Sequence, residues 1–525
     1  MDFNGLIAFL GLAVAVFTVM PKYKKLDLRL RLNRIDLGLL GSGFLVLLYL
    51  LYLPVLRELQ LDFDLGPWLW GFNQEIFTNS VLVLLVVYFA IRLKTTKISR
   101  GNIDKANDLF EQLLFDKKYD ELVELLDRHV EAIIRVQASD SIRNTLSKLL
   151  LPSLDVDQLF SRNTEPESKL FKLKSKLAMT LAHEDECCEV AEVLLLRLFK
   201  HEALIQRIAY NKPYLGIRII QQDLNKWTKE EFITRYFCEL IDDLSSIYYF
   251  ELNHTQTLHG MSRYEISKSS KLLHYLFSNV TVAESLEIYR PVGEKVCDLL
   301  ETNQALIKRY NEPLGRFYDV ERQKCPIDNS LHFFNLMIIE SLFQGVRWHM
   351  WLYYCDSFSK SIIGSMNPTK DVDFSLEWPT PFHYLLYQVV DHLIQWLDAV
   401  QYLEGDASNA KVKEEPKSDN SSIPQCSAIC LGRVIWQIFD SGLITNEFKT
   451  GMLEKVLRFI SGHQQIESMS RLCKLVENTV IQRGNNPKLD SNYLALLAEL
   501  YHDVDHVITC ETESFYNSLT AHLES

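Results

Sequence analysis

Two histidines near the end of the sequence stand one helical turn apart. His502 and His506 enclose Asp503, Val504 and Asp505. Imidazoles at positions i and i+4 of a helix can bind zinc, but the metalloprotease motif has a glutamate general base where Asp503 stands here. No CxxC pair completes a zinc-binding set. We therefore expect His502 and His506 to lie on a solvated helix face, and we expect no metal or other cofactor.

A second pair, Arg458 and His463, has a spacing that allows phosphate chemistry. It resembles the loose arginine-to-histidine spacing of the all-α HEPN ribonucleases. The resemblance implies that Arg458 and His463 would polarise a scissile phosphate and move a proton. A polar residue usually follows the arginine in that family, whereas Phe459 follows it here.

A third group lies in the aromatic-rich segment 331–363, which contains Glu340, Arg347 and His349. Charged residues at the centre of a bilayer are costly, so this segment reads as the central buried helix of a soluble domain. Glu340 and Arg347 are seven residues apart and share a helix face. We expect an internal ion pair, and the alternative is a ligand pocket.

No other catalytic set can be assigned from spacing. The sequence contains neither GxxxxGK[ST] nor GxGxxG, the glycine-rich loops that bind nucleotide phosphates. No serine or cysteine nucleophile can be matched with a histidine and an acid. The sequence therefore favours a non-enzymatic protein.

The first predicted helices of the chain are three apolar runs, at 3–20, 37–56 and 80–91. A helix that crosses the hydrocarbon core needs roughly 17–25 residues. The first two runs meet this length, and the third reaches it only with its flanks. We predict a three-helix transmembrane anchor over residues 1–100. Small residues within the runs favour close helix packing, either within one anchor or between copies of the chain.

Basic residues set the orientation of this anchor. Six lie between the first two runs, while Arg57 alone lies between the second and third, with four acidic residues. Further basic residues follow the third run. Because short loops rich in Lys and Arg stay on the cytoplasmic side, we predict an outer N-terminus and a cytoplasmic C-terminal domain in a multi-pass membrane protein.

Beyond the anchor, apolar residues recur every three or four positions. Over 102–135 this pattern is interrupted only at Asp116–Lys118, which predicts an antiparallel helical hairpin. Similar stretches follow to about residue 519, and strand-like alternation is nearly absent. The fold class predicted is all-α, with the anchor followed by a large α-helical cytoplasmic domain, either an irregular bundle or an array of helical hairpins.

One polar segment divides that region. Residues 405–424 are rich in Gly, Ser, Pro and charge, and such a composition cannot build a core. We predict a flexible linker there. The expected organisation is an anchor (1–100), a helical domain (101–404), the linker (405–424) and a C-terminal helical subdomain (425–525).

The net charge of the chain indicates which classes of partner it can bind. The net charge is −13, and residues 1–100 carry eleven basic and seven acidic residues, so residues 101–525 carry −17. An acidic body is poorly suited to nucleic acid. The expected partners are the lipid bilayer and another protein. The predicted function is a membrane-anchored scaffold or signal-transmitting protein; the alternatives are a membrane-disrupting effector of a phage-defence or abortive-infection type and a membrane-tethered HEPN-like ribonuclease.

Overall fold

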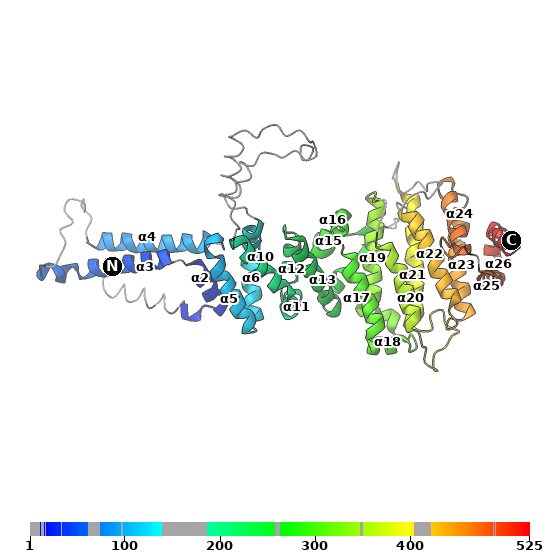
Figure 1. Cartoon of the computed structure of the whole chain (residues 1–525), viewed down its shortest axis with the longest axis horizontal. Coiled ribbons are helices and arrows are strands. Elements are labelled where there is room, and N and C mark those ends of the chain that lie inside the picture. Colours follow the sequence, from blue (N-terminus) through cyan, green and yellow to red (C-terminus); the bar gives the residue numbers. More distant parts are fainter. Residues whose placement is uncertain are drawn as a thin grey trace, which may run out of the picture. The chain divides into compact units, whose positions relative to one another are not determined.

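The computed structural model of the chain is predominantly helical, which confirms the predicted all-α class (Figure 1). The structure describes residues 11, 15, 17–32, 34–60, 74–95, 98–138, 186–257, 263–346, 350–403, 422–486, 488 and 490–524. Within these ranges the strands are β1 (Gln256–Thr257) and β2 (Tyr264–Glu265), which pair antiparallel with Gln256 opposite Glu265.

Backbone contacts divide the chain into two compact units. Unit 1 comprises Met1–Ile208 and Arg218–Lys229, and unit 2 comprises Ala209–Ile217 and Glu230–Ser525. The division runs through three consecutive helices: α11 (Glu202–Asn211), α12 (Pro213–Ile220) and α13 (Lys226–Asp242). No change in composition marks this place in the sequence. The predicted linker lies outside the described residues except for its last three, Ser422 to Pro424, and α22 begins at Ile423.

The described part of unit 1 includes a short basic helix followed by a long apolar hairpin. The basic helix is α2 (Lys22–Arg31), and the hairpin consists of α3 (Arg34–Glu58) and α4 (Gln74–Thr95). The Tyr88 hydroxyl near the end of α4 donates to Asp36 near the start of α3 at 2.7 Å. This bond shows that the two helices run antiparallel.

Only part of the predicted anchor can be recognised. Among the described residues, the segment Asp36–Leu53 of α3 is long and apolar enough to cross a bilayer, and the apolar part of α4, Ile76–Tyr88, is shorter. The first apolar run lies largely outside the described residues. The three-helix anchor predicted from the sequence is therefore not confirmed.

The predicted hairpin over 102–135 is confirmed. After the 3₁₀ turn η2 (Arg100–Asn102), α5 (Ile103–Phe115) and α6 (Tyr119–Ala138) pack on each other, and α10 (Glu186–Lys200) packs on both. Lys117, with φ of 55°, turns the chain between α5 and α6, and the Lys118 amide donates back to the Leu113 carbonyl. These bonds satisfy carbonyls that the end of α5 would otherwise leave unpaired.

Unit 2 is a succession of helices with buried central members. Its helices after α13 are α14 (Ile247–Asn253), α15 (Lys271–Phe277), α16 (Val280–Ser285), α17 (Tyr289–Thr302), α18 (Gln304–Tyr310), η3 (Phe317–Glu321), η4 (Arg322–Lys324), α19 (Pro326–Phe343), α20 (Leu352–Ser365), α21 (Pro381–Asp398), η5 (Ala399–Tyr402), α22 (Ile423–Asp440), α23 (Asn446–His463), α24 (Glu467–Ile481), α25 (Ser491–His502), α26 (His506–Glu511) and α27 (Glu513–Leu523). Helix α19 packs on α17 and α21, and α22 packs on α20, α21 and α24 (Figure 1).

The single central helix expected over 331–363 is wrong, because the structure divides this segment into α19 and α20. Gly345 adopts φ of 75°, its amide donates to Leu342 and the Val346 amide donates to Ser341. This is a Schellman motif, which ends a helix and requires a residue such as glycine at the left-handed position. The expected burial does hold for α19, most of whose side chains are buried.

Candidate functional site

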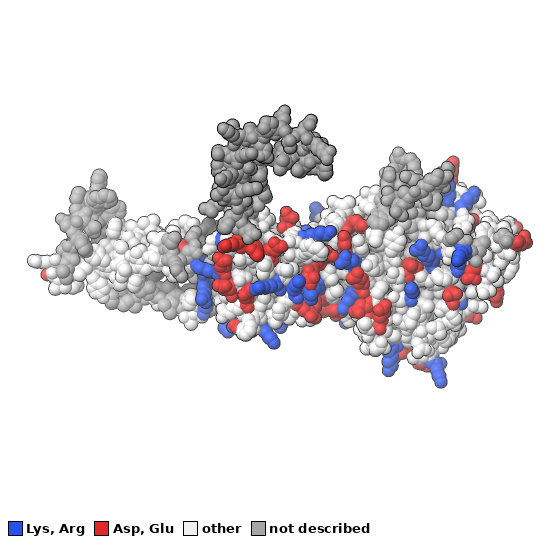
Figure 2. Space-filling model, in the orientation of Figure 1, with Lys and Arg blue, Asp and Glu red and all other residues white. Residues whose placement is uncertain are grey.

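In the described part of unit 1, the hairpin of α3 and α4 exposes many large apolar side chains. Leu37, Leu45 and Val55 of α3 are between 51% and 67% exposed, and Val83, Leu84 and Ile91 of α4 are between 57% and 68% exposed. In Figure 2 the visible surface of this hairpin is almost entirely free of charged residues. Contiguous apolar surface of this kind marks a site that binds lipid or a partner.

The two helices approach closely at Gly43. A Cβ atom there would lie 2.6 Å from a side-chain carbon of Leu85. A Cβ at Gly38, in contrast, would meet nothing within 4 Å. A side chain at Gly43 would therefore require the Leu85 side chain to move.

A buried carboxylate joins α2 to α6. Asp27 is 6% exposed and accepts hydrogen bonds from Arg31 Nε at 2.8 Å, Arg128 Nη1 at 2.9 Å and His129 Nε2 at 2.6 Å. Burial alone would raise the pKa of Asp27, but the hydrogen bonds and charges of His129 and Arg31 outweigh it and lower the pKa. The basic segment next to α3 is therefore fixed to the hairpin α5–α6 within unit 1.

Arg458 and His463 are not brought together on one substrate-facing site. Arg458 is exposed and pairs with Glu454 one turn earlier on α23. The His463 ring contacts the Phe459 carbonyl through Nδ1 at 2.8 Å and Asp398 through Nε2 at 2.9 Å. Because both ring nitrogens already have partners, the structure gives no support to the role that the ribonuclease resemblance implies.

His502 and His506 do not share a helix face, which corrects the expectation from their spacing. Helix α25 ends at His502, and Asp505 caps the new helix α26 by accepting from the Val507 amide at 2.8 Å. The Tyr516 hydroxyl lies 3.2 Å from His502 Nε2, while His506 faces Cys510. In the part of the chain that the structure describes, no three His, Cys, Asp or Glu residues could hold a metal ion.

Glu340 is buried and forms an ion pair with Arg263. Arg263, just before β2, donates to both carboxylate oxygens, with Nε–Oε1 of 3.0 Å and Nη2–Oε2 of 2.9 Å. This hydrogen bond is the main cause that raises the pKa of Arg263. Arg347 and His349 lie outside the described residues. Glu340 thus fixes the strand pair to α19, and the predicted pairing with Arg347 is not tested.

A group of titratable side chains lines a pocket of about 250 Å³ between η4, α19 and α21. Asp328 and His332 come from α19, and Tyr384 and His392 come from α21. Arg322 of η4 donates to the Tyr384 hydroxyl at 3.0 Å and lies 3.6 Å from Asp328. We call these five residues the polar pocket.

Burial dominates the electrostatics of the polar pocket. It raises the pKa of Asp328 to about 7, although the charge of Arg322 opposes this shift. Burial lowers the pKa of His332 to about 3 and that of His392 to about 4, and the charge of Arg322 adds to both shifts. Both imidazoles are therefore neutral at pH 7. Groups with shifted pKa values occur both at functional sites and in structural networks.

The polar pocket does not contain an activated nucleophile. The Thr255 hydroxyl lies 2.8 Å from His332 Nε2, but it donates its proton to the Leu252 carbonyl at 2.8 Å. Thr255 therefore accepts from the imidazole and is not deprotonated by it. The arrangement suits a hydrogen-bonded structural network in the core of unit 2.

Sequence reasoning overlooked this pocket, although a signal was present. Asp328 and His332 are one turn apart, and Tyr384, Gln388 and His392 follow the same spacing on a second, otherwise apolar helix. Polar stripes on two apolar helices indicate a shared buried site. The sequence alone does not reveal that the two stripes face each other.

The pKa of Asp328 predicts a pH-dependent stability. The pKa of Asp328 is raised above the value of about 3.9 in an unfolded chain. The contribution of Asp328 to the free energy of unfolding is therefore complete below about pH 3.9 and is lost as the pH rises towards about 7. Asp328→Asn should unfold at a higher temperature than the natural chain, by a margin that grows from pH 5 to pH 7 and then levels off. Thermal unfolding in detergent measures this, with the exposed Asp319→Asn as the control for charge. A margin independent of pH would contradict it.

Comparison of the chain with protein-family models, curated proteins and solved structures finds no match.

Proposed function

We propose that this chain is a membrane-anchored, non-enzymatic helical protein that holds protein partners at a bilayer. The observation that supports the proposal best is the exposed apolar surface of α3 and α4. Leu45 is 67% exposed and Leu84 is 68% exposed on helices with no charged residue near their centres. The transfer of such helices from water to lipid is favourable.

The distribution of charge suggests the orientation. Helix α2 carries Lys22, Lys24, Lys25, Arg29 and Arg31 immediately before α3. In the proposed topology this helix and the acidic body lie on the cytoplasmic side, and the turn after α3 lies outside. The free thiols fit a reducing compartment, since no described cysteine forms a disulfide bond.

Placing charge in the hairpin tests the anchor. Each arginine at the centre of a spanning helix costs about 2.5–3.5 kcal/mol on insertion scales. Leu45→Arg combined with Leu84→Arg should therefore move the chain from the membrane pellet to the supernatant after alkaline extraction. The control is Phe115→Arg, because Phe115 is 87% exposed at the end of α5, outside the hairpin. Retention of the double variant in the pellet would contradict the proposal.

One observation favours a second function, a membrane-disrupting effector. The Asp27 cluster links α2, which adjoins the hairpin, to α6 of the body, and such a link could transmit a change in the body to the anchor. Leakage of a dye from cells that express the intact chain, abolished in Asp27→Ala, would favour the effector. Recovery of a stable protein partner without leakage would favour the scaffold.

A further inference from the structure

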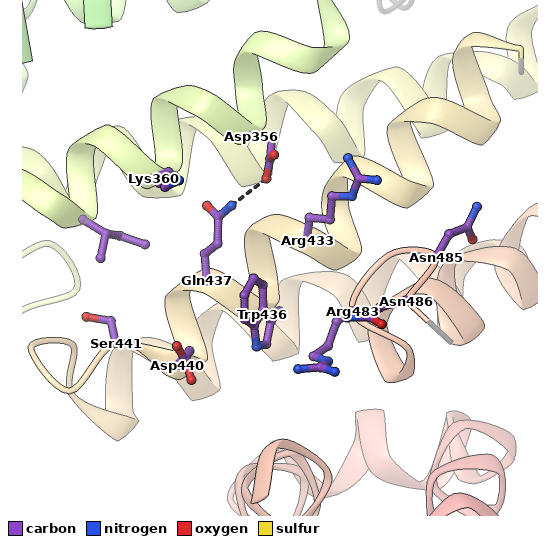
Figure 3. Close-up of a pocket in the computed structure, with 11 residues that line it drawn as sticks. Asp356, Lys360, Arg433, Trp436, Gln437, Asp440, Ser441, Arg483, Asn485 and Asn486 are labelled. Atoms are coloured by element: carbon purple, nitrogen blue, oxygen red, sulfur yellow. Dashed lines mark hydrogen bonds between the residues drawn. The ribbon is translucent and has the colours of Figure 1, made fainter. Parts of the chain in front are cut away.

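A cavity of about 710 Å³ in unit 2 is lined by both basic and acidic side chains. Figure 3 shows Asp356 beside Arg433, Lys360 at the opposite end, and the guanidinium of Arg483 pointing away from that of Arg433. Arg483 also forms an ion pair with Asp490 at 3.0 Å. Because the two signs of charge are interspersed, this lining does not select a ligand of one charge.

A second pocket, of about 450 Å³, lies in unit 1 where α2, the start of α3 and α5 meet. This volume is within the range of about 300–1,000 Å³ that small-molecule sites occupy. The pocket is lined by four leucines and four polar residues, which are Arg29, Leu30, Leu32, Leu37, Lys105, Asp108, Leu109 and Gln112. We call it the α2–α5 pocket.

Contacts within unit 1 hold the walls of the α2–α5 pocket in place. Leu30 is 3% exposed and Leu109 is 8% exposed, so both are packed into unit 1. The Asn102 side chain donates to the Leu30 carbonyl at 3.4 Å, which joins the end of α2 to the turn before α5. The hydrogen bonds of Asp27 fix α2 to α6. The pocket is therefore formed before any ligand binds, which lowers the cost of binding.

The apolar side of the α2–α5 pocket continues onto the hairpin. Leu37 is 58% exposed and is the second residue of Asp36–Leu53, the segment of α3 that is long and apolar enough to cross a bilayer. In Figure 2 the surface of unit 1 changes from nearly uncharged to charged where the hairpin ends. If α3 spans a membrane as proposed, the pocket lies at the cytoplasmic boundary of the bilayer, at the level of the lipid headgroups.

The charged side of the α2–α5 pocket has a net positive charge. Arg29 and Lys105 are exposed, and neither side chain forms an ion pair with another described residue. Asp108 is the acidic residue of the lining, so two basic residues and one acidic residue give a net charge of +1. This charge matches the single negative charge of a phosphodiester, and guanidinium and ammonium groups are the usual ligands of phosphate oxygens.

We infer that the α2–α5 pocket binds one anionic phospholipid of the cytoplasmic leaflet, of the net charge that phosphatidylglycerol carries. Arg29 and Lys105 bind the phosphate, and an acyl chain extends past Leu37 along α3 into the bilayer. The inference rests on the proposed anchor and adds a specific lipid to it. Because the pocket includes residues of α2, α3 and α5, the bound lipid would stabilise the packing of the hairpin on the remainder of unit 1.

Native mass spectrometry of the detergent-solubilised full chain tests the inference, with phosphatidylglycerol as the probe and phosphatidylcholine of the same acyl chains as the comparison. The natural chain should retain one phosphatidylglycerol in preference to phosphatidylcholine. A hydrogen bond to a charged group contributes enough that Arg29→Gln should weaken this binding by at least about tenfold. Lys105→Gln, on a different helix, should have a similar effect. Both side chains are exposed, so the variants should fold, which circular dichroism checks.

Lys24→Gln is the matched control. Lys24 is an exposed residue of the same helix as Arg29, and it does not line the pocket. Lys24→Gln removes the same charge from α2 and should change lipid binding by less than about twofold, because basic residues near a bilayer also attract anionic lipids without a site. Equal weakening by Lys24→Gln and Arg29→Gln would overturn the inference, since the attraction would then be general to α2.

Two further outcomes would contradict a lipid site. Equal retention of phosphatidylcholine and phosphatidylglycerol would show that the charge of the pocket selects nothing. Displacement of the bound lipid by millimolar glycerol 3-phosphate would show that the pocket takes a free phosphate and does not need the acyl chain. The alkaline extraction of the α3 and α4 variant tests the anchor separately. A chain that stays in the membrane but fails to retain phosphatidylglycerol would therefore overturn this inference alone.

Discussion

Replacing Gly432 with alanine should destabilise unit 2 strongly, because α22 and α24 leave no room for a side chain there. A Cβ at this position would lie 2.2 Å from the Thr479 carbonyl oxygen and 2.8 Å from the Gly484 amide nitrogen. Both are backbone atoms, so the clash cannot be relieved by a side-chain rotation. Overpacking usually costs about 1–3 kcal/mol. We expect the free energy of unfolding to fall by at least the upper end of this range.

A matched glycine controls for helix propensity. Gly451 lies on the exposed face of α23, and a Cβ there would meet nothing within 4 Å. Gly451→Ala should therefore stabilise the chain by up to about 1 kcal/mol, which is the propensity difference between the two residues. Denaturant unfolding of both variants in detergent measures the contrast. Equal stability of Gly432→Ala and the natural chain would show that α22 and α24 do not pack as closely as described.

The second large effect concerns Asp27. Its removal leaves Arg31, Arg128 and the buried His129 without their shared acceptor, and His129 is 1% exposed. Breaking a buried ion pair costs about 3–5 kcal/mol. We expect Asp27→Ala to lower the free energy of unfolding by an amount near the lower end of this range, because both arginines reach solvent. Amide hydrogen exchange should show that α2 and α6 lose protection while α24 does not.

Acid should reproduce this loss in the natural chain. The pKa of Asp27 is lowered, so its contribution is complete above the pKa of about 3.9 of an unfolded aspartate and disappears as the pH falls below it. Asp120→Ala is the control, since Asp120 is an exposed carboxylate on the same helix as His129. If Asp120→Ala and Asp27→Ala changed the exchange of α2 equally, the buried cluster would not be what fixes this helix.

Local patterns were enough to predict the helices but not always their ends. The hairpin of α5 and α6 was predicted because its apolar spacing and its polar turn lie within about 35 consecutive residues. The break at Gly345 was overlooked, because the apolar pattern on both sides of it outweighed one glycine. That residue ends α19 through its positive φ, a signal that sequence reading can use when glycine follows a helical pattern.

The candidate sites were less predictable, because their residues are distant in sequence. Asp27 and His129 are 102 positions apart, and Arg263 and Glu340 are 77 apart. Spacing rules compare only neighbours on one helix, which is why Glu340 was matched with Arg347.

In the proposed topology, α3 and α4 cross a membrane and unit 2 lies on the cytoplasmic side. An impermeant thiol reagent applied to intact cells tests it, with single cysteines at Gln60, after the end of α3, and at Lys24, on α2. The proposed topology predicts that Gln60→Cys is labelled, whereas Lys24→Cys and the exposed native Cys510 are labelled only after the cells are permeabilised. Labelling of Cys510 in intact cells, with no label at Gln60→Cys, would contradict the claim.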